Sequence, residues 1–155
     1  MIVQAAYMSD RSLVIAFAVC ATVFTLPFAA TTLYYAFDNE DDSCQKGRRA
    51  GLTLSEWLKV TGFIDVAILA LYWLLAIVSI VRSADIALMG IFVTVFASSF
   101  ANFVVWVIGI VLVSTPENRI CVADGTELGV MALVNLVLFF ITTAVSLTSS
   151  PRERG

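Results

Sequence analysis

The fold is decided by the stretch LSEWLKVTGFIDVAILALYWLLAIVSIV, residues 54–81, in which Asp65 is the only charged residue after Lys59. A helix rises about 1.5 Å per residue, so about 20 apolar residues cross a hydrocarbon core of about 30 Å. Backbone amides find no water in lipid, and this run does not alternate between polar and apolar residues as barrel strands do. The stretch therefore predicts a transmembrane helix.

Three further apolar stretches have the same length and character. They cover residues about 12–37, 86–114 and 128–147. The first is longer than the apolar core of a signal peptide, so we expect it to be retained as a span. The sequence thus predicts an all-α fold, a four-helix transmembrane bundle that forms a single domain over residues 1–155.

The composition agrees with this class and argues against several functions. Of the 155 residues 60% are hydrophobic and 14% are charged, and the mean hydropathy is +0.95. Without histidine the chain lacks the most frequent general base and metal ligand, so we expect no enzyme, no bound metal and no cofactor. The net charge of −3 comes from short polar segments, which disfavours nucleic acid as a partner.

The predicted helix ends carry local signals. Thr53 and Glu56 have the spacing of a capping box, in which each side chain accepts a hydrogen bond from the other residue's amide. We expect Asp124 and Glu127 to act in the same way before the fourth span. Pro116 is expected just beyond the end of the third span.

Two of the three cysteines lie in the polar loops and bear on orientation. Cys44 and Cys121 each follow a span that ends on the same side, so we expect a disulfide between them, although two free thiols are the alternative. A disulfide places both loops in a non-cytosolic space and the termini in the cytosol or matrix. Basic residues are nearly equal on the two sides and do not decide orientation. The plasma membrane, an endomembrane and the mitochondrial inner membrane are all compatible.

Asp65 is the strongest functional signal, because an ionised carboxylate in hydrocarbon costs several kcal/mol unless it is paired or protonated. We expect it to face the bundle interior. Counting depth from the loop side, Asn135 is nearly level with Asp65, Asn102 is a turn deeper, and Thr31 and Thr32 are nearby. These residues predict one intramembrane polar layer, which either fixes helix packing or forms a proton or cation relay; packing is the favoured reading.

Other residues within the spans have predicted structural roles. Thr94, Ser98 and Asn102 are spaced by four and share one helix face. Trp57 and Trp106 lie towards the loop side, as expected for aromatic residues at a membrane interface, and Trp73 is expected to pack between helices.

The sequence around LSEWLKVTG, FVVWVIG and the loop cysteines resembles the transmembrane protein 272-like family of small four-span eukaryotic proteins. The residues that carry the resemblance, which covers about half of the chain, are Cys44, Leu54, Trp57, Leu58, Val60, Gly62, Trp106, Gly109 and Cys121. The resemblance implies the same four-span layout and paired loop cysteines, and it brings no established activity.

Two hypotheses of function follow. The first is a non-enzymatic structural or accessory subunit that packs against other membrane proteins or copies of itself within the lipid bilayer. The alternative is a small proton or cation channel or transporter centred on Asp65.

Overall fold

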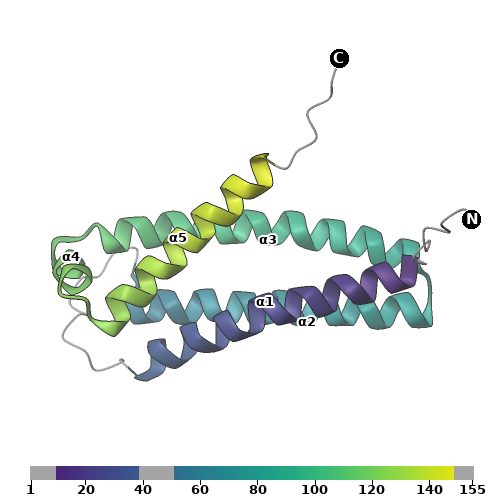
Figure 1. The fold of residues 1–155 in the computed structure, drawn as a ribbon, viewed down its shortest axis with the longest axis horizontal. Coiled ribbons are helices and arrows are strands. Elements are labelled where there is room, and N and C mark those ends of the chain that lie inside the picture. Colours follow the sequence, from purple (N-terminus) through teal and green to yellow (C-terminus); the bar gives the residue numbers. More distant parts are fainter. Residues whose placement is uncertain (1–9, 39–50, 149–155) are drawn as a thin grey trace, which may run out of the picture. The chain divides into compact units, whose positions relative to one another are not determined.

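The fold was analysed in a computed structural model that describes residues 10–38 and 51–148, with side chains up to residue 141. Within these ranges the elements are α-helices, drawn in Figure 1. Their bounds are α1 (Asp10–Asp38), α2 (Leu54–Val81), α3 (Ala84–Val113), α4 (Pro116–Ala123) and α5 (Glu127–Thr148). The predicted all-α fold is confirmed, and each of the four predicted spans agrees with its helix to within two residues at either end.

Three of the helices, α1, α2 and α3, are long and apolar enough to cross a membrane. A fourth candidate span involves α5, which is preceded by α4 at an angle of 97° across a short break. The described chain therefore has three candidate spans, or four when α4 and α5 are counted as one bent span. This is the architecture of a helical membrane bundle.

The second polar segment differs from the prediction, because residues 116–123 form the short helix α4. Pro116 occupies its first turn, where the missing amide hydrogen costs nothing. Gly125, at a φ of 67°, follows its C-terminus in the left-handed region. There the amides of Gly125 and Thr126 donate to the carbonyls of Val122 and Cys121, the pattern of a Schellman motif.

The start of α5 is capped by Thr126, whose hydroxyl oxygen accepts from the amide of Gly129 at 3.2 Å. The expectation that Asp124 and Glu127 form this cap is therefore wrong. Asp124 instead follows the last residue of α4 as its C-cap. Gly125 thus ends α4 and Thr126 starts α5. Because these two residues are adjacent, the chain turns sharply between the two helices.

The capping box predicted before α2 is confirmed. The amide of Thr53 donates to Glu56 Oε2 at 2.7 Å, and the amide of Glu56 donates to Thr53 Oγ1 at 3.2 Å. Two amides that the first turn of a helix leaves without partners are thereby satisfied.

The described residues divide into two compact units that share the long helices. The first contains residues up to 33 and residues 60–102, and the second contains residues 34–59 and those from 103 onward. Helices α1, α2 and α3 each contribute to both units. Each unit is described by itself below.

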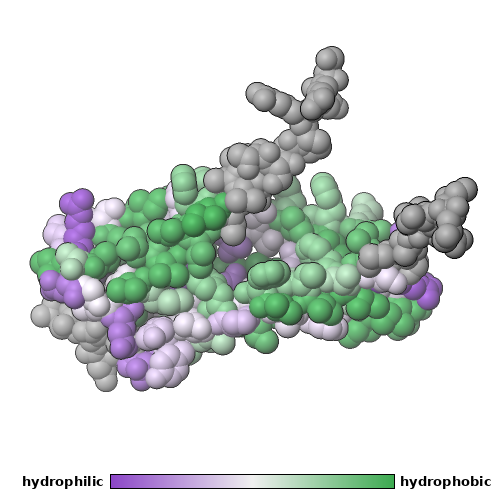
Figure 2. All heavy atoms as spheres, viewed as in Figure 1, coloured by the Kyte–Doolittle hydropathy of each residue, from purple (hydrophilic) through white to green (hydrophobic). Residues whose placement is uncertain are grey.

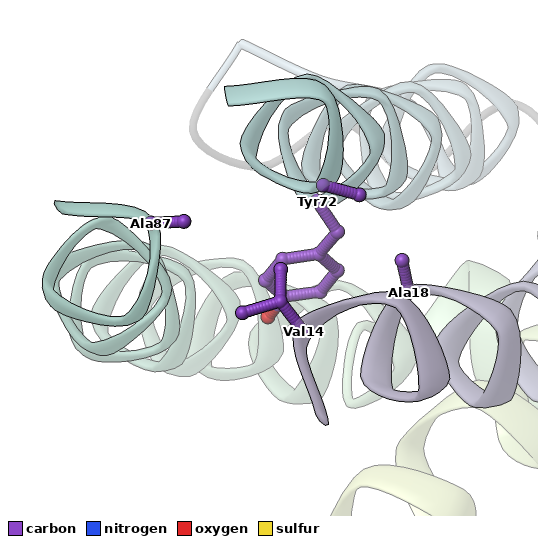
Figure 3. Packing of buried hydrophobic residues seen from close by; sticks show 5 residues of the cluster. Val14, Ala18, Tyr72 and Ala87 are labelled. Carbon is purple, nitrogen blue, oxygen red and sulfur yellow. The ribbon is translucent and has the colours of Figure 1, made fainter. Parts of the chain in front are cut away.

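The first unit has a small apolar core around Tyr72. The ring extends from α2 towards Val14 and Ala18 of α1 and Ala87 of α3, as Figure 3 shows. Tyr72 is 9% exposed, and Phe17 meets its ring edge to face with centroids 5.0 Å apart. The other side chains of this core are small, so the three helices approach closely around one large ring.

Two glycines in the first unit receive leucines from the neighbouring helix. A Cβ added at Gly62 on α2 would lie 2.6 Å from Leu33 Cγ of α1. A Cβ added at Gly90 on α3 would lie 2.5 Å from Leu75 Cδ2 of α2. Real Cβ atoms do not come this close, so both contacts require the missing side chain. Small residues that let helices approach are the usual means of association in lipid.

In the second unit a tryptophan packs against a glycine of the neighbouring helix in the same way. Trp57 of α2 is 2% exposed, and its indole ring occupies the space where a Cβ at Gly109 of α3 would lie. Its Nε1 donates to the carbonyl oxygen of Val105 at 2.8 Å. Val105 lies one turn before Gly109, so the glycine opens the path by which the indole reaches this carbonyl. Trp57 is therefore a buried contact between helices, and its predicted depth near the membrane interface stays a prediction.

The outward faces of the helices are apolar, as the hydrophobic colour over much of Figure 2 illustrates. On α3 the side chains of Phe92, Phe96 and Phe100 are 74%, 73% and 69% exposed. The opposite face of the same helix carries Thr94 and Ser98, which are half-buried. A helix that turns its largest apolar side chains outward and its polar ones inward has the pattern expected in lipid.

The Trp57–Gly109 contact generates the first prediction. Gly109→Ala places a methyl group against the indole ring and should destabilise the bundle by about 1–3 kcal/mol, as overpacking does elsewhere. Ala97→Val, on the exposed face of α3, is the matched control and should change stability little. The measurement is detergent-induced unfolding followed by tryptophan fluorescence and circular dichroism. Equal losses in the two variants would show that this contact does not hold the helices together.

Candidate functional site

Asp65 lies in the middle of the inward face of α2. Residues one and two turns away on the same face are buried, namely Leu58, Gly62, Leu69 and Tyr72. Asp65 itself is half-buried, and no hydrogen bond or ion pair joins its carboxylate to another residue in the described part of the chain. The carboxylate therefore faces inward, as the sequence predicts, at a point where the face is less tightly covered.

Asn102 lies on α3 at about the level of Asp65. Helices α2 and α3 are antiparallel, so a residue one position later in α2 is level with a residue one position earlier in α3. The Leu75–Gly90 contact then brings Asp65 level with about residue 100 of α3. Counted from this contact, Asn102 lies within one turn of the level of Asp65, and its predicted depth in the membrane stays a prediction.

The inward face of α3 has the composition that the spacing predicts. Thr94, Ser98 and Asn102 are all half-buried, whereas Ala97 and Ser99 beside them are exposed. The prediction that these three polar residues share one face is confirmed. Ser98 Oγ also donates to the carbonyl oxygen of Val95 at 3.0 Å, so this hydroxyl already has a partner in its own helix.

The two threonines of α1 have different environments. Thr32 is fully buried, and Thr31 is exposed with its hydroxyl donating to the carbonyl oxygen of Pro27 at 2.7 Å. Thr31 thus lies outside the inward face on which the polar layer was predicted. Its hydrogen bond satisfies a backbone carbonyl inside its own helix, next to the proline that interrupts the regular pattern.

Asn135 of α5 belongs to the second unit. Its side chain is 7% exposed, and Nδ2 donates to the carbonyl oxygen of Met131 at 3.0 Å, one turn earlier. This buried amide is thereby satisfied at least in part by its own helix. The predicted layer of five residues as a whole stays a prediction.

Three tryptophans form polar contacts that the sequence analysis did not find. Besides Trp57, Trp73 donates from Nε1 to the hydroxyl of Thr22 at 2.9 Å, and this hydroxyl donates onward to the carbonyl oxygen of Ala18 at 2.8 Å. Trp106 donates to the carbonyl oxygen of Leu136 at 3.3 Å. For Trp57 and Trp73 the signal available in the sequence was a glycine or a small hydroxyl residue in another span.

Trp106 also joins α3 to α5 by ring stacking in the second unit. Its ring stacks on Phe139 with centroids 5.3 Å apart and an interplanar angle of 30°. The indole ring therefore contributes apolar area and a donor to the same helix contact.

Cys44 and Cys121 were predicted to form a disulfide between the two polar loops. Cys121 is 7% exposed and lies on α4, and Cys44 lies outside the described residues. The pairing of Cys44 with Cys121 therefore stays a prediction. Cys20 is an exposed free thiol on α1.

The described residues contain no group of three or more histidine, cysteine or acidic residues that could hold a metal ion. Asp65 stands alone among side chains that are neutral. Comparison of the chain with protein-family models, with curated proteins and with solved structures gives no match. The resemblance to the transmembrane protein 272-like family stays a prediction.

The adjacent threonines of α1 generate the second prediction. Thr32→Ala removes a fully buried hydroxyl and methyl group and should destabilise the protein by about 1–2 kcal/mol more than Thr31→Ala. The two substitutions are chemically identical and differ only in the face of the helix. The midpoint of thermal unfolding in detergent micelles measures the difference, and a larger loss for Thr31→Ala would reverse the assignment of the faces.

Proposed function

We propose that this protein is a non-enzymatic structural or accessory subunit, a multi-pass membrane bundle that packs against other membrane proteins or copies of itself. The observation that carries this proposal is the use of the polar side chains in the spans. Trp57, Trp106 and Asn135 donate to backbone carbonyls, as does Ser55, whose hydroxyl reaches the carbonyl oxygen of Ala36 at 2.7 Å. The bonds of Trp57, Trp106 and Ser55 join different helices and so fix helix positions, whereas that of Asn135 lies within α5.

The outward face of α3 supports the same role. Met89, Phe92, Phe96 and Phe100 form one exposed apolar ridge along the helix. Such a ridge is compatible with lipid, and it also offers large, rigid aromatic surface to a neighbouring span. The accessory role requires that part of this surface contacts another membrane helix.

A second candidate is a small proton or cation channel or transporter centred on Asp65. It is favoured by one observation, an inward-facing carboxylate with no hydrogen bond or ion pair to a described residue. Ionisable groups at such positions often mark ion pathways. The rest of the described inward face is neutral, so this candidate depends on Asp65 alone.

We further propose that Cys44 and Cys121 form a disulfide in a non-cytosolic space, with the termini on the cytosolic or matrix side. The support is the burial of Cys121 in α4, together with the even number of crossings that results when α4 and α5 are counted as one bent span. A bridge would join the segment after α1 to the turn before α5. The plasma membrane, an endomembrane and the mitochondrial inner membrane each have a face that permits it.

The third prediction separates the two candidate functions. Purified protein in liposomes should give no flux of H⁺, Na⁺ or K⁺ above that of protein-free vesicles, and Asp65→Asn should leave this unchanged. In membranes, a photoreactive phenylalanine analogue at Phe96, which is 73% exposed, should cross-link to one membrane protein in stoichiometric amount. The same analogue at Tyr72, which is 9% exposed, should give only links within the chain.

The opposite pattern would favour transport. If the wild type conducts an ion, and a folded Asp65→Asn variant does not, the accessory role is wrong. Cross-links from Phe96 to lipid alone would likewise remove its support. Folding of each variant is checked by circular dichroism in the same detergent.

The fourth prediction concerns the disulfide. Non-reducing peptide mapping of protein from freshly isolated, alkylated membranes should recover the Cys44 and Cys121 peptides joined. Cys20 should carry the alkylating group, because it is exposed and free. Recovery of Cys44 and Cys121 as alkylated thiols would place the loops in a reducing space and reverse the proposed orientation.

A further inference from the structure

Helix α4 is held at both ends against the helices that it connects. The carbonyl oxygen of Leu112, in the last turn of α3, accepts hydrogen bonds from Thr115 Oγ1 at 2.8 Å and from Asn118 Nδ2 at 3.0 Å. At the other end, the carbonyl oxygen of Cys121 accepts from the amide of Thr126 at 3.2 Å and from Thr126 Oγ1 at 3.1 Å. These bonds give α4 a defined orientation within the second unit.

A glycine in the first turn of α5 keeps the corner between α4 and α5 tight. A Cβ added at Gly129 would lie 2.8 Å from the carbonyl oxygen of Cys121 and 3.0 Å from Cα of Val122. Both atoms belong to the backbone of α4, which cannot give way as the end of a flexible side chain does. The angle of 97° between α4 and α5 is therefore a fixed feature of this unit (Figure 1).

This angle gives the direction of α4 relative to the membrane. Only Ser114 and Thr115 separate α4 from the apolar helix α3, and residues 124–126 separate it from the apolar helix α5. In a membrane α4 therefore lies where both helices leave the hydrocarbon. Because a helix at nearly a right angle to a span lies close to the membrane plane, α4 runs along the boundary between hydrocarbon and water.

The outward face of α4 carries an apolar strip between two charges. Pro116, Ile120 and Ala123 have the spacing of one helix face, and all three are exposed, Ile120 to 62%. Helical spacing places Arg119 on one flank of this strip and Glu117 on the other, and both are exposed. Neither charged side chain has an ion pair with a described residue.

The surroundings that suit this face are those of the lipid headgroups. Asn118 and Cys121 occupy the inward face of α4 and are 0% and 7% exposed, so Ile120 cannot turn into the bundle. Amphipathic helices bind the boundary between headgroups and acyl chains through an apolar face flanked by charges. A zwitterionic headgroup offers a phosphate to Arg119 and an ammonium group to Glu117.

We propose that the outward face of α4 binds the phospholipid headgroup layer, with Ile120 at the junction of headgroups and acyl chains. This contact goes beyond the accessory role, because it involves lipid at one end of the bundle and no second protein. It fixes the depth of the chain in the membrane on the side of the polar loops. Either proposal can hold without the other.

The fifth prediction measures the depth of α4. A fluorescent amino acid is introduced at Ile120 by nonsense suppression, and the protein is reconstituted into phosphatidylcholine liposomes that contain nitroxide-labelled lipid. A nitroxide on the headgroup should quench this probe about twofold more strongly than one deep on the acyl chain. The matched control is the same probe at Val137, which is 47% exposed and lies about 15 Å along α5 from its first residue. There the deep nitroxide should quench more strongly.

Iodide in the buffer, which quenches probes in water, should affect the probe at Ile120 only slightly. Strong quenching by iodide without quenching by the headgroup nitroxide would place the outward face of α4 in water and overturn the proposal. Strongest quenching by the deep nitroxide would also overturn it, since α4 would then enter the hydrocarbon as part of a re-entrant segment. Circular dichroism checks that each labelled protein is folded.

Discussion

Two apolar helices in lipid gain little by exchanging lipid contacts for each other, so this bundle depends on how closely their backbones can approach. In the described units three close contacts between neighbouring long helices are made at glycines. Leu33 enters the space at Gly62, Leu75 that at Gly90, and Trp57 that at Gly109. The same glycine that admits Trp57 exposes the carbonyl of Val105 to its indole nitrogen. Packing and hydrogen bonding are therefore joined at one position.

The polar residues of the spans follow from the same constraint. A donor without a partner is costly in hydrocarbon, and helix carbonyls are the acceptors that every neighbouring span offers. Ser55 and Trp106 use carbonyls of a neighbouring helix, and Asn135 uses one in its own helix. Asp65 is the exception, since a carboxylate cannot be satisfied by a carbonyl oxygen when ionised. This contrast separates the residues that fix the structure from the one that has a capacity for ligand chemistry.

The sequence predicted the helices well because length and hydropathy are sufficient to define spans, and because the Thr53–Glu56 box is a local signal. It predicted α4 poorly, since eight residues of mixed polarity between spans have no period that distinguishes a helix from a loop. The burial of Trp57 between helices was not predicted, because it depends on Gly109, which lies 52 positions away.

The candidate site was predicted in part for a related reason. The inward direction of Asp65 and the shared face of Thr94, Ser98 and Asn102 follow from helical spacing within one element. The relative depth of Asp65 and Asn102 depends on the register between two helices, which the Leu75–Gly90 contact sets. The exposed position of Thr31 reflects the rotation of α1, and no pattern in its mostly apolar sequence fixes that rotation.

The account rests on lipid as the solvent of the outward helix faces. Nitroxide labels placed singly along α3 in liposomes measure this directly, through collisions with oxygen, which dissolves in lipid, and with a water-soluble nickel chelate. Labels at Phe92, Phe96 and Phe100 should collide often with oxygen and rarely with nickel, and labels at Thr94 and Ser98 should collide little with oxygen. Frequent collisions of nickel with all three phenylalanine sites would show that water covers this face and would contradict the account.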